Sequence, residues 1–162
     1  MIDILVYLFE TYGYADACPE EPEQLTRKLS MAGFDEADIA EAVEWLKGLR
    51  VAASQEAPKS VAGSQSIRFY TEAEQARLDV GSRGFISFLE SAGVLDMRRR
   101  EMAIERAMAL HDAEVSVSQF KVIVLMVLWQ ERASVDALIL DELLTDEVAE
   151  QEDFWQDAVS TH

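Results

Sequence analysis

The chain has 162 residues, which is enough for one domain or for two small lobes that share a core. Apolar residues make up 49% of it and charged residues 28%, the composition of a globular protein. The formal net charge of −17 disfavours nucleic acid as a partner, because Lys and Arg supply most of the affinity for phosphates. A single cysteine, Cys18, excludes an intramolecular disulfide and indicates a reducing compartment.

Neither a secretory signal nor a membrane span is expected. The opening MIDILVYLFE carries an acid, Asp3, and has no basic residue ahead of its apolar run. The longest apolar run, residues 122–129, has 8 residues, whereas a spanning helix needs about 20. We therefore expect a soluble, cytoplasmic protein without a membrane partner.

The charge is distributed unevenly along the chain. Residues 1–65 hold 12 acids and 5 bases, residues 66–110 hold 7 acids and 7 arginines, and residues 111–162 hold 12 acids and 2 bases. A neutral middle segment is thus flanked by two acidic ones. Such a field favours a basic protein partner, or solvation alone, over nucleic acid.

Two helices are expected near the start of the chain. Apolar residues recur at helical spacing over residues 3–12 and predict the first helix. A second helix starts at Pro22, where the missing N–H costs nothing, and runs to about Met31. In this second helix Leu25 and Leu29 are expected to point inward.

A third helix is expected over residues 35–50, after a turn at Gly33 and an N-cap at Asp35. Its expected core residues are Ile39, Ala42, Val43, Leu46 and Leu49. This helix lies where a helix-turn-helix protein places its DNA-reading helix, yet it carries five acids against two bases. The topology therefore suggests DNA binding, and the charge opposes it.

Residues 51–65 are small and polar, which is typical of a flexible connector or of the tip between two strands. Residues 66–70 alternate in polarity and predict a short strand, with a weaker partner strand near Val51. Three helices followed by a small hairpin is the order of a winged helix. We therefore predict a mainly α fold, in which a winged-helix-like N-terminal lobe (residues 1–70) packs with a helical C-terminal lobe (residues 71–145).

The C-terminal lobe is predicted to be a helical bundle. Thr71 and Glu74 form a capping box, so a helix starts directly after Thr71. A further helix covers about residues 82–92. Its expected core residues are Phe85, Ile86, Phe88 and Leu89.

Three further helices and a tail complete the prediction. Asp96 caps a helix over residues 97–110. Its expected buried residues are Met102, Ile104, Ala107 and Met108. Ser118 caps the next helix, whose middle, VIVLMVLW, is apolar all round and indicates a central position. A last helix spans about residues 135–145, and residues 146–162 are expected to form an acidic, disordered tail.

Six segments, in order, resemble the Smg family of bacterial proteins: MIDILVYLFETY, AGFDEADIAEAVEWL, RFYTEAEQARLD, RGFISFLESAGVLD, REMAIERAMAL and FKVIVLMVLW. The resemblance covers about residues 1–145. It implies an uncharacterised protein of the proteobacterial cytoplasm, whose gene often lies near those for peptide deformylase, a DNA-uptake protein and a topoisomerase-like protein. It implies no catalytic residues, because the family supplies none.

No catalytic, cofactor or metal site is predicted. The only histidines are His111 and His162, so zinc would lack the several Cys and His ligands that it prefers. A loop histidine at the end of a helix explains His111 better than a metal ligand does. The sequence GSRG at residues 81–84 lacks the Lys and the preceding strand of a phosphate-binding loop. Cys18 has no neighbouring base in the sequence that would activate its thiol.

Four residues are candidates for contact with a partner. Arg98, Arg99 and Arg100 span about 200° of a helix, so they cannot all be buried. They form either a docking patch for an RNA or an acidic protein, or a solvated face that balances nearby acids. We expect that changing all three to Glu leaves the fold intact, because exposed charges contribute little to stability. Trp45 lies at the edge of the buried face of the third helix and is either a core residue or an anchor for a partner.

Two functions remain open. The first is a non-enzymatic protein-interaction protein, an adaptor or regulator, which the acidity and the lack of a reactive constellation favour. The second is a nucleic-acid-binding regulator that uses the arginine-rich middle region in place of the acidic third helix. A salt series separates them, since a nucleic-acid complex weakens steeply as the salt concentration rises.

Overall fold

The structure, a computed structural model, describes residues 1–13, 15–54, 70–111, 114–132 and 137–144. Within these ranges the chain is helical and forms no strand, which confirms the mainly α fold. The α-helices, in chain order, are α1 (Ile2–Thr11), α2 (Pro22–Met31), α3 (Glu36–Ser54), α4 (Glu72–Arg77), α5 (Val80–Ser91), α6 (Met97–Met108), α7 (Val117–Gln130) and α8 (Ala137–Leu144). A short 3-10 helix, η1 (Ala15–Ala17), follows α1.

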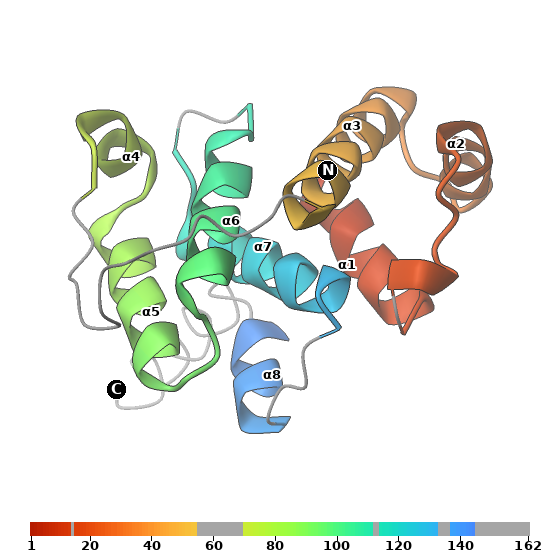
Figure 1. The fold of residues 1–162 in the computed structure, drawn as a ribbon. Helices are drawn as coiled ribbons and strands as arrows, with labels where there is room; N and C mark the ends of the chain where they lie inside the picture. The colour runs from red at the N-terminus through yellow and green to blue at the C-terminus, as the bar shows by residue number, and fades with distance from the viewer. Residues whose placement is uncertain (14, 55–69, 112–113, 133–136, 145–162) are drawn as a thin grey trace, which may run out of the picture.

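Helix α7 lies at the centre of the molecule, with the other helices arranged around it (Figure 1). It contacts α1 and α3 from the N-terminal half of the chain and α5, α6 and α8 from the C-terminal half. Nine of its 14 residues are buried, and they include every residue from 123 to 129. The prediction that VIVLMVLW forms a central helix is therefore confirmed.

The helices α1 and α2 match the predicted ones closely. Pro22 stands in the first turn of α2, and Leu25 and Leu29 are the two buried residues of that helix. Gly33 follows with a φ of 98°, in the left-handed region that only glycine adopts without strain. The polypeptide can therefore turn sharply and enter α3, whose buried face packs on both α1 and α2.

Helix α3 is longer than predicted and runs through Val51 to Ser54. The expected strand near Val51 is therefore wrong. A β-branched residue costs only a few tenths of a kcal/mol in a helix, and the alanines at 52 and 53 favour it. In addition, Nη2 of Arg98 donates a hydrogen bond to the backbone oxygen of Ala53, at 2.6 Å. A cation at that place satisfies a carbonyl that the helix end leaves open.

The winged-helix detail of the prediction is not confirmed. Residues 66–69 of the expected strand lie outside the described residues, and Tyr70 belongs to no strand. The succession of α2, a short turn and α3 is shared with helix-turn-helix proteins, but that succession alone does not make a winged helix. The expected tail, residues 146–162, also lies outside the described residues.

Side-chain caps set the starts of α4 and α6 as predicted. Thr71 Oγ1 accepts a hydrogen bond from the backbone N–H of Glu74 at 3.2 Å, and the Glu74 carboxylate accepts one from the N–H of Thr71 at 3.3 Å. Asp96 accepts from the N–H of Arg99 at 2.8 Å. Each cap satisfies a backbone donor that the first turn of a helix leaves open.

Helices α5 and α7 begin earlier than predicted, because other residues cap them. Asp79 accepts a hydrogen bond from the backbone N–H of Ser82 at 2.7 Å and thereby starts α5. Ser116 caps α7 in place of Ser118, since Gln119, three residues after Ser116, completes a reciprocal capping box.

One predicted core residue, Phe88, is not buried. The four residues expected to form the core of α5 span about 160° of the helix, which is wider than a typical apolar stripe of about 100°. Leu89 and Ile86 lie on one side of that arc and are buried, whereas Phe88 lies at its opposite edge and is 49% exposed.

The polar groups that α7 brings into the core have partners. Nε1 of Trp129 donates a hydrogen bond to the backbone oxygen of Tyr12 at 2.8 Å. Nζ of Lys121 lies 3.2 Å from a carboxylate oxygen of Glu142 on α8 and 5.6 Å from the centre of the Phe85 ring on α5. Across the described part of the chain, no helix combines the length and the apolar character that a membrane span needs.

We expect the substitution Val124→Asp to prevent folding. Val124 is completely buried in α7, so an unpaired carboxylate there would cost more than about 4 kcal/mol, a large share of the stability of a small domain. Circular dichroism during heating would show loss of the cooperative transition. A melting temperature equal to that of the wild type would mean that α7 is not enclosed by its neighbours.

Candidate interaction surface

Arg98, the first of the three predicted arginines, is bonded within the protein. It forms an ion pair with Glu131, the C-cap of α7, in addition to its hydrogen bond to Ala53 of α3. From the first turn of α6 it therefore joins the C-terminal ends of two other helices. Cations are favoured at such ends, because the last carbonyls point outward there.

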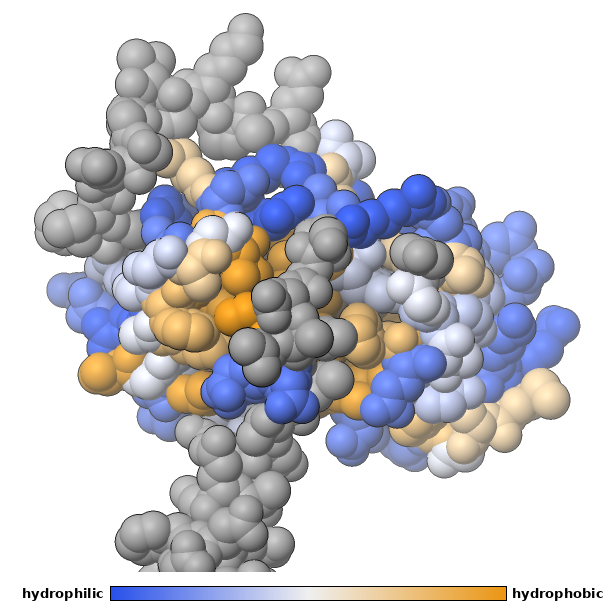
Figure 2. Space-filling view, turned by 90° about the horizontal axis from the view of Figure 1, so that it is seen from below, coloured by the Kyte–Doolittle hydropathy of each residue, from blue (hydrophilic) through white to orange (hydrophobic). Residues whose placement is uncertain are grey.

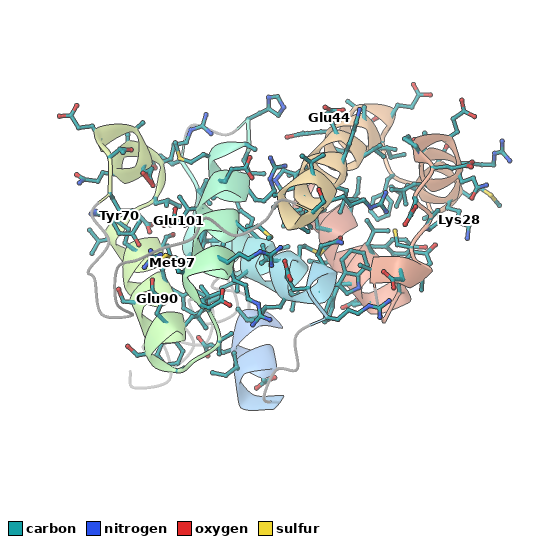
Figure 3. The ribbon with its side chains drawn as sticks, in the orientation of Figure 1. Lys28, Glu44, Tyr70, Glu90, Met97 and Glu101 are labelled. Carbon is teal, nitrogen blue, oxygen red and sulfur yellow. The ribbon has the colours of Figure 1, made fainter. Side chains whose placement is uncertain are left out.

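Arg100 is also bonded internally and is only 8% exposed. Its guanidinium lies 3.3 Å from Glu90 of α5 and 3.2 Å from Glu101 of α6. Figure 3 shows these two acids on the same side of the molecule, at the contact between the two helices. Arg99 is partly buried, and within the described residues its side chain has no ion pair or hydrogen bond.

The expectation that all three arginines are exposed, so that reversing their charges leaves the fold intact, is therefore wrong for Arg100. Its side chain fills the contact between two helices, and a glutamate there would face Glu90 and Glu101. Arg98, Arg99 and Arg100 consequently do not form one positive patch on the surface.

Trp45 lies in the core, with 4% of its surface exposed. Its Nε1 donates to the backbone oxygen of Arg106 on α6, and Nη1 of Arg106 donates to the backbone oxygen of Trp45, both at 3.0 Å. A Cβ at Gly48, one turn further on α3, would lie 2.1 Å from Nη1 of Arg106. Trp45 thus joins α3 to α6 and offers almost no surface to a partner, as its interpretation as a core residue requires.

Other arginines of the neutral middle region also serve contacts between elements. Nη1 of Arg77 donates hydrogen bonds to the backbone oxygens of Met108 and Leu110, the latter at 2.7 Å, at the end of α6. Arg83 lies 6.0 Å from the centre of the Tyr70 ring. The neutral charge of residues 66–110 therefore does not correspond to a basic surface.

The exposed face of α5 is the most unusual surface that the structure describes. Six residues of this 12-residue helix are exposed, and none is charged. They are Val80, Gly81, Gly84, Ser87, Phe88 and Ser91. At 100° per residue they fall within an arc of about 120°, so they form one continuous strip along the helix. We call these six residues the α5 face.

Two large apolar side chains stand on the α5 face. Val80 is 76% exposed and Phe88 is 49% exposed. The half-buried ring of Phe85 stacks beside that of Phe88, with 6.2 Å between the ring centres, and extends the apolar surface toward α7. Seen from below, hydrophobic residues gather on the left half of the molecule, the side on which α5 lies in Figure 1 (Figure 2).

Sequence reasoning missed this surface for two reasons. The run of apolar residues around Phe88 predicts a core position for it, and the glycines at 81 and 84 point in the sequence only to the pattern of a phosphate-binding loop. Two signals were nevertheless present. The apolar arc of α5 was too wide for one buried stripe, and residues 80–89 contain one charged residue, Arg83, in a chain that is 28% charged.

The residues weighed for chemistry are not brought together. His111 is exposed, and within the described ranges no group of three or more His, Cys, Asp or Glu is placed to hold a metal ion. Burial raises the pKa of the Cys18 thiol, although Arg50 and Lys28 lie close enough to oppose that shift. Cys18 therefore stays protonated at neutral pH and is a poor nucleophile.

A comparison with protein families matches residues 1–152 to the family described as "Protein of unknown function (DUF494)". Among curated proteins, "Protein Smg homolog" of Aromatoleum aromaticum is 58% identical over 150 residues, which cover 93% of this chain and 96% of that protein. The protein of the same name from Azoarcus sp. is 51% identical over 145 residues, 90% of this chain and 93% of that protein. No solved structure matches the chain significantly.

We expect Arg100→Glu to destabilise the protein and Arg99→Glu to leave its stability nearly unchanged. The first change removes two ion pairs from a buried position and sets like charges against each other, at a cost of about 1–3 kcal/mol. The second places an acid near the start of α6, where the helix dipole favours it, so the change stays within about 0.5 kcal/mol. Urea unfolding of both variants would measure the difference. Equal midpoints would show that Arg100 is exposed in solution.

We expect Gly48→Ala to destabilise the protein, although alanine normally favours a helix by about 1 kcal/mol. The added methyl group would displace the Arg106 guanidinium from its hydrogen bond to Trp45. Gly84→Ala in α5 is the matched control, because a Cβ there meets no atom within 4 Å. It should raise the free energy of unfolding by about 0.5–1 kcal/mol. A stabilising effect of both changes would contradict the close contact between α3 and α6.

Proposed function

Since this chain belongs to the Smg family, a family described only as being of unknown function, we propose that it is a non-enzymatic cytoplasmic adaptor or regulator that binds a protein partner. The observation that carries this proposal is the α5 face, with Val80 and Phe88 exposed on a helix surface that bears no charge. Apolar side chains clustered on one surface of a soluble protein commonly mark an interaction site. Aromatic residues such as Phe88 are enriched at the centres of interfaces.

The surroundings of the α5 face support a protein partner over a small molecule. Its exposed residues lie on the convex side of a helix, whereas ligand sites are concave and enclose their ligand. A helix face of this kind presents side chains one and two turns apart, which suits a helix or an apolar groove on another protein. The family membership is consistent with such a role because the matched proteins carry no name that denotes an enzyme.

The nucleic-acid alternative finds less support. It relied on the arginines of the middle region, and Arg77, Arg98, Arg100 and Arg106 are all bonded within the protein. The outer side of α3, where a helix-turn-helix protein would contact DNA, exposes acids such as Glu44 at its upper edge (Figure 3). Phosphates would be repelled there, and these four arginines are already engaged inside the protein.

We expect Phe88→Glu to lower the capture of a protein partner at least tenfold, which corresponds to about 1.4 kcal/mol. The full chain would serve as bait in a cytoplasmic extract of a bacterium that encodes it, with bound proteins identified by mass spectrometry. Met31→Glu on α2 is the matched control, because Met31 is 82% exposed and receives the same charge away from α5.

Both variants should melt like the wild type, since neither side chain is part of the buried core. The expected result is that wild type and Met31→Glu recover the same partner and that Phe88→Glu does not. Equal recovery by all three proteins would contradict the proposed role of the α5 face.

A further inference from the structure

We infer that the α5 face binds a second copy of this chain, through an antiparallel crossing of two α5 helices centred on Gly84. The inference rests on the proposed function, because it names a partner for the same surface. Three observations carry it: the charge of the face, the spacing of its large residues and the open space above Gly84.

Charge selects the α5 face for contact between two copies. Each copy has a net charge of −17, so two copies repel each other over most orientations. Two acids placed next to each other across an interface cost several kcal/mol. Acids are common on the exposed side of α3, so that side is unsuited to contact between two copies. The α5 face carries no charged residue, so two copies of it meet without like charges in contact.

The spacing of the large residues is self-complementary. Val80 and Phe88 each lie four residues from Gly84, one on either side, and all three are exposed. A two-fold axis through Gly84 reverses the second helix and places Phe88 of each copy beside Val80 of the other. Such a contact is isologous and closes at two copies, as the commonest oligomers do. It also packs the i, i+4 ridges of both helices, the commonest crossing class of globular proteins.

Small residues at the centre allow the two helices to approach closely. A Cβ at Gly84 would meet nothing within 4 Å, so the space directly above this residue is empty in one copy. Gly81 and Ser87 on either side are also small. Interaxial distances of packed helices run from about 8 to 10 Å, and residues of this size permit the shorter end of that range.

The expected dimer is weak, and its association constant should rise with the salt concentration. A stable interface buries about 800 Å² on each partner, and one helix face offers less. Added salt screens the repulsion between the two acidic bodies and leaves the apolar contact intact, so association should strengthen as salt rises. A complex held by ion pairs, or a complex with nucleic acid, would weaken instead.

Sedimentation equilibrium of the full chain tests the inference, at concentrations from about 5 µM to about 500 µM and at about 0.05 M and about 0.5 M NaCl. We expect a monomer–dimer equilibrium whose association constant is at least about fivefold larger at the higher salt concentration. Phe88→Glu should weaken the dimer at least about tenfold, and Met31→Glu should not.

A second variant separates loss of contact from loss of fold. Gly84→Gln introduces a better helix former into open space, so the monomer should melt at the same or a higher temperature. The same side chain would hold two α5 helices apart, and the dimer should be lost. A dimer that persists in both Phe88→Glu and Gly84→Gln, or that weakens as salt rises, would overturn the inference.

The outcomes also distinguish this inference from the proposed function. A wild type that stays monomeric throughout, together with partner capture that depends on Phe88, would refute the dimer and retain the α5 face as a docking surface for another protein. A dimer that depends on Phe88, together with no captured partner, would retain the dimer and refute the wider role.

Discussion

Burial of a helix without a polar side is the constraint on which the rest of this structure depends. Residues 123–129 of α7 are all buried, and each large apolar side chain removed from water contributes about 1.5–3 kcal/mol. A helix of this kind cannot lie on a surface, so neighbours must surround it. The helices α1, α3, α5, α6 and α8 do so, each with its own apolar side turned inward. The side chains that these surrounding helices expose to solvent then decide what the protein can bind.

Arginine side chains complete this assembly by donating hydrogen bonds to backbone oxygens of neighbouring segments, at a helix end for Arg77 and Arg98 and within α3 for Arg106. Arg77, Arg98 and Arg106 each reach from their own helix to a backbone oxygen of another segment. The planar guanidinium suits this task, because it offers several donors in a fixed arrangement and remains charged at any physiological pH. These three arginines are thus used between helices and add little positive charge to the surface.

Local signals predicted the fold well, and contacts between distant segments explain the failures. The capping pairs at Thr71 and Asp96 and the apolar run of α7 are recognisable from a few neighbouring residues, and the structure confirms them. The strand predicted near Val51 is wrong because Arg98 of α6, 47 positions away, bonds to the last turn of α3. The arginine cluster was misjudged for the same reason, since Glu90 and Glu131 cannot be recognised as its partners from spacing. The α5 face can be recognised only when the structure shows which side of α5 is buried.

The central position of α7 also governs how the chain matures during synthesis. The apolar face of α1, which includes Leu5 and Leu8, packs against a helix that is translated more than 100 residues later. At roughly 5–20 residues per second, α1 waits on the order of 5–20 s for its partner to leave the ribosome. During that interval its contact with α3 can form but its contact with α7 cannot, so part of the apolar face of α1 stays exposed until α7 is complete.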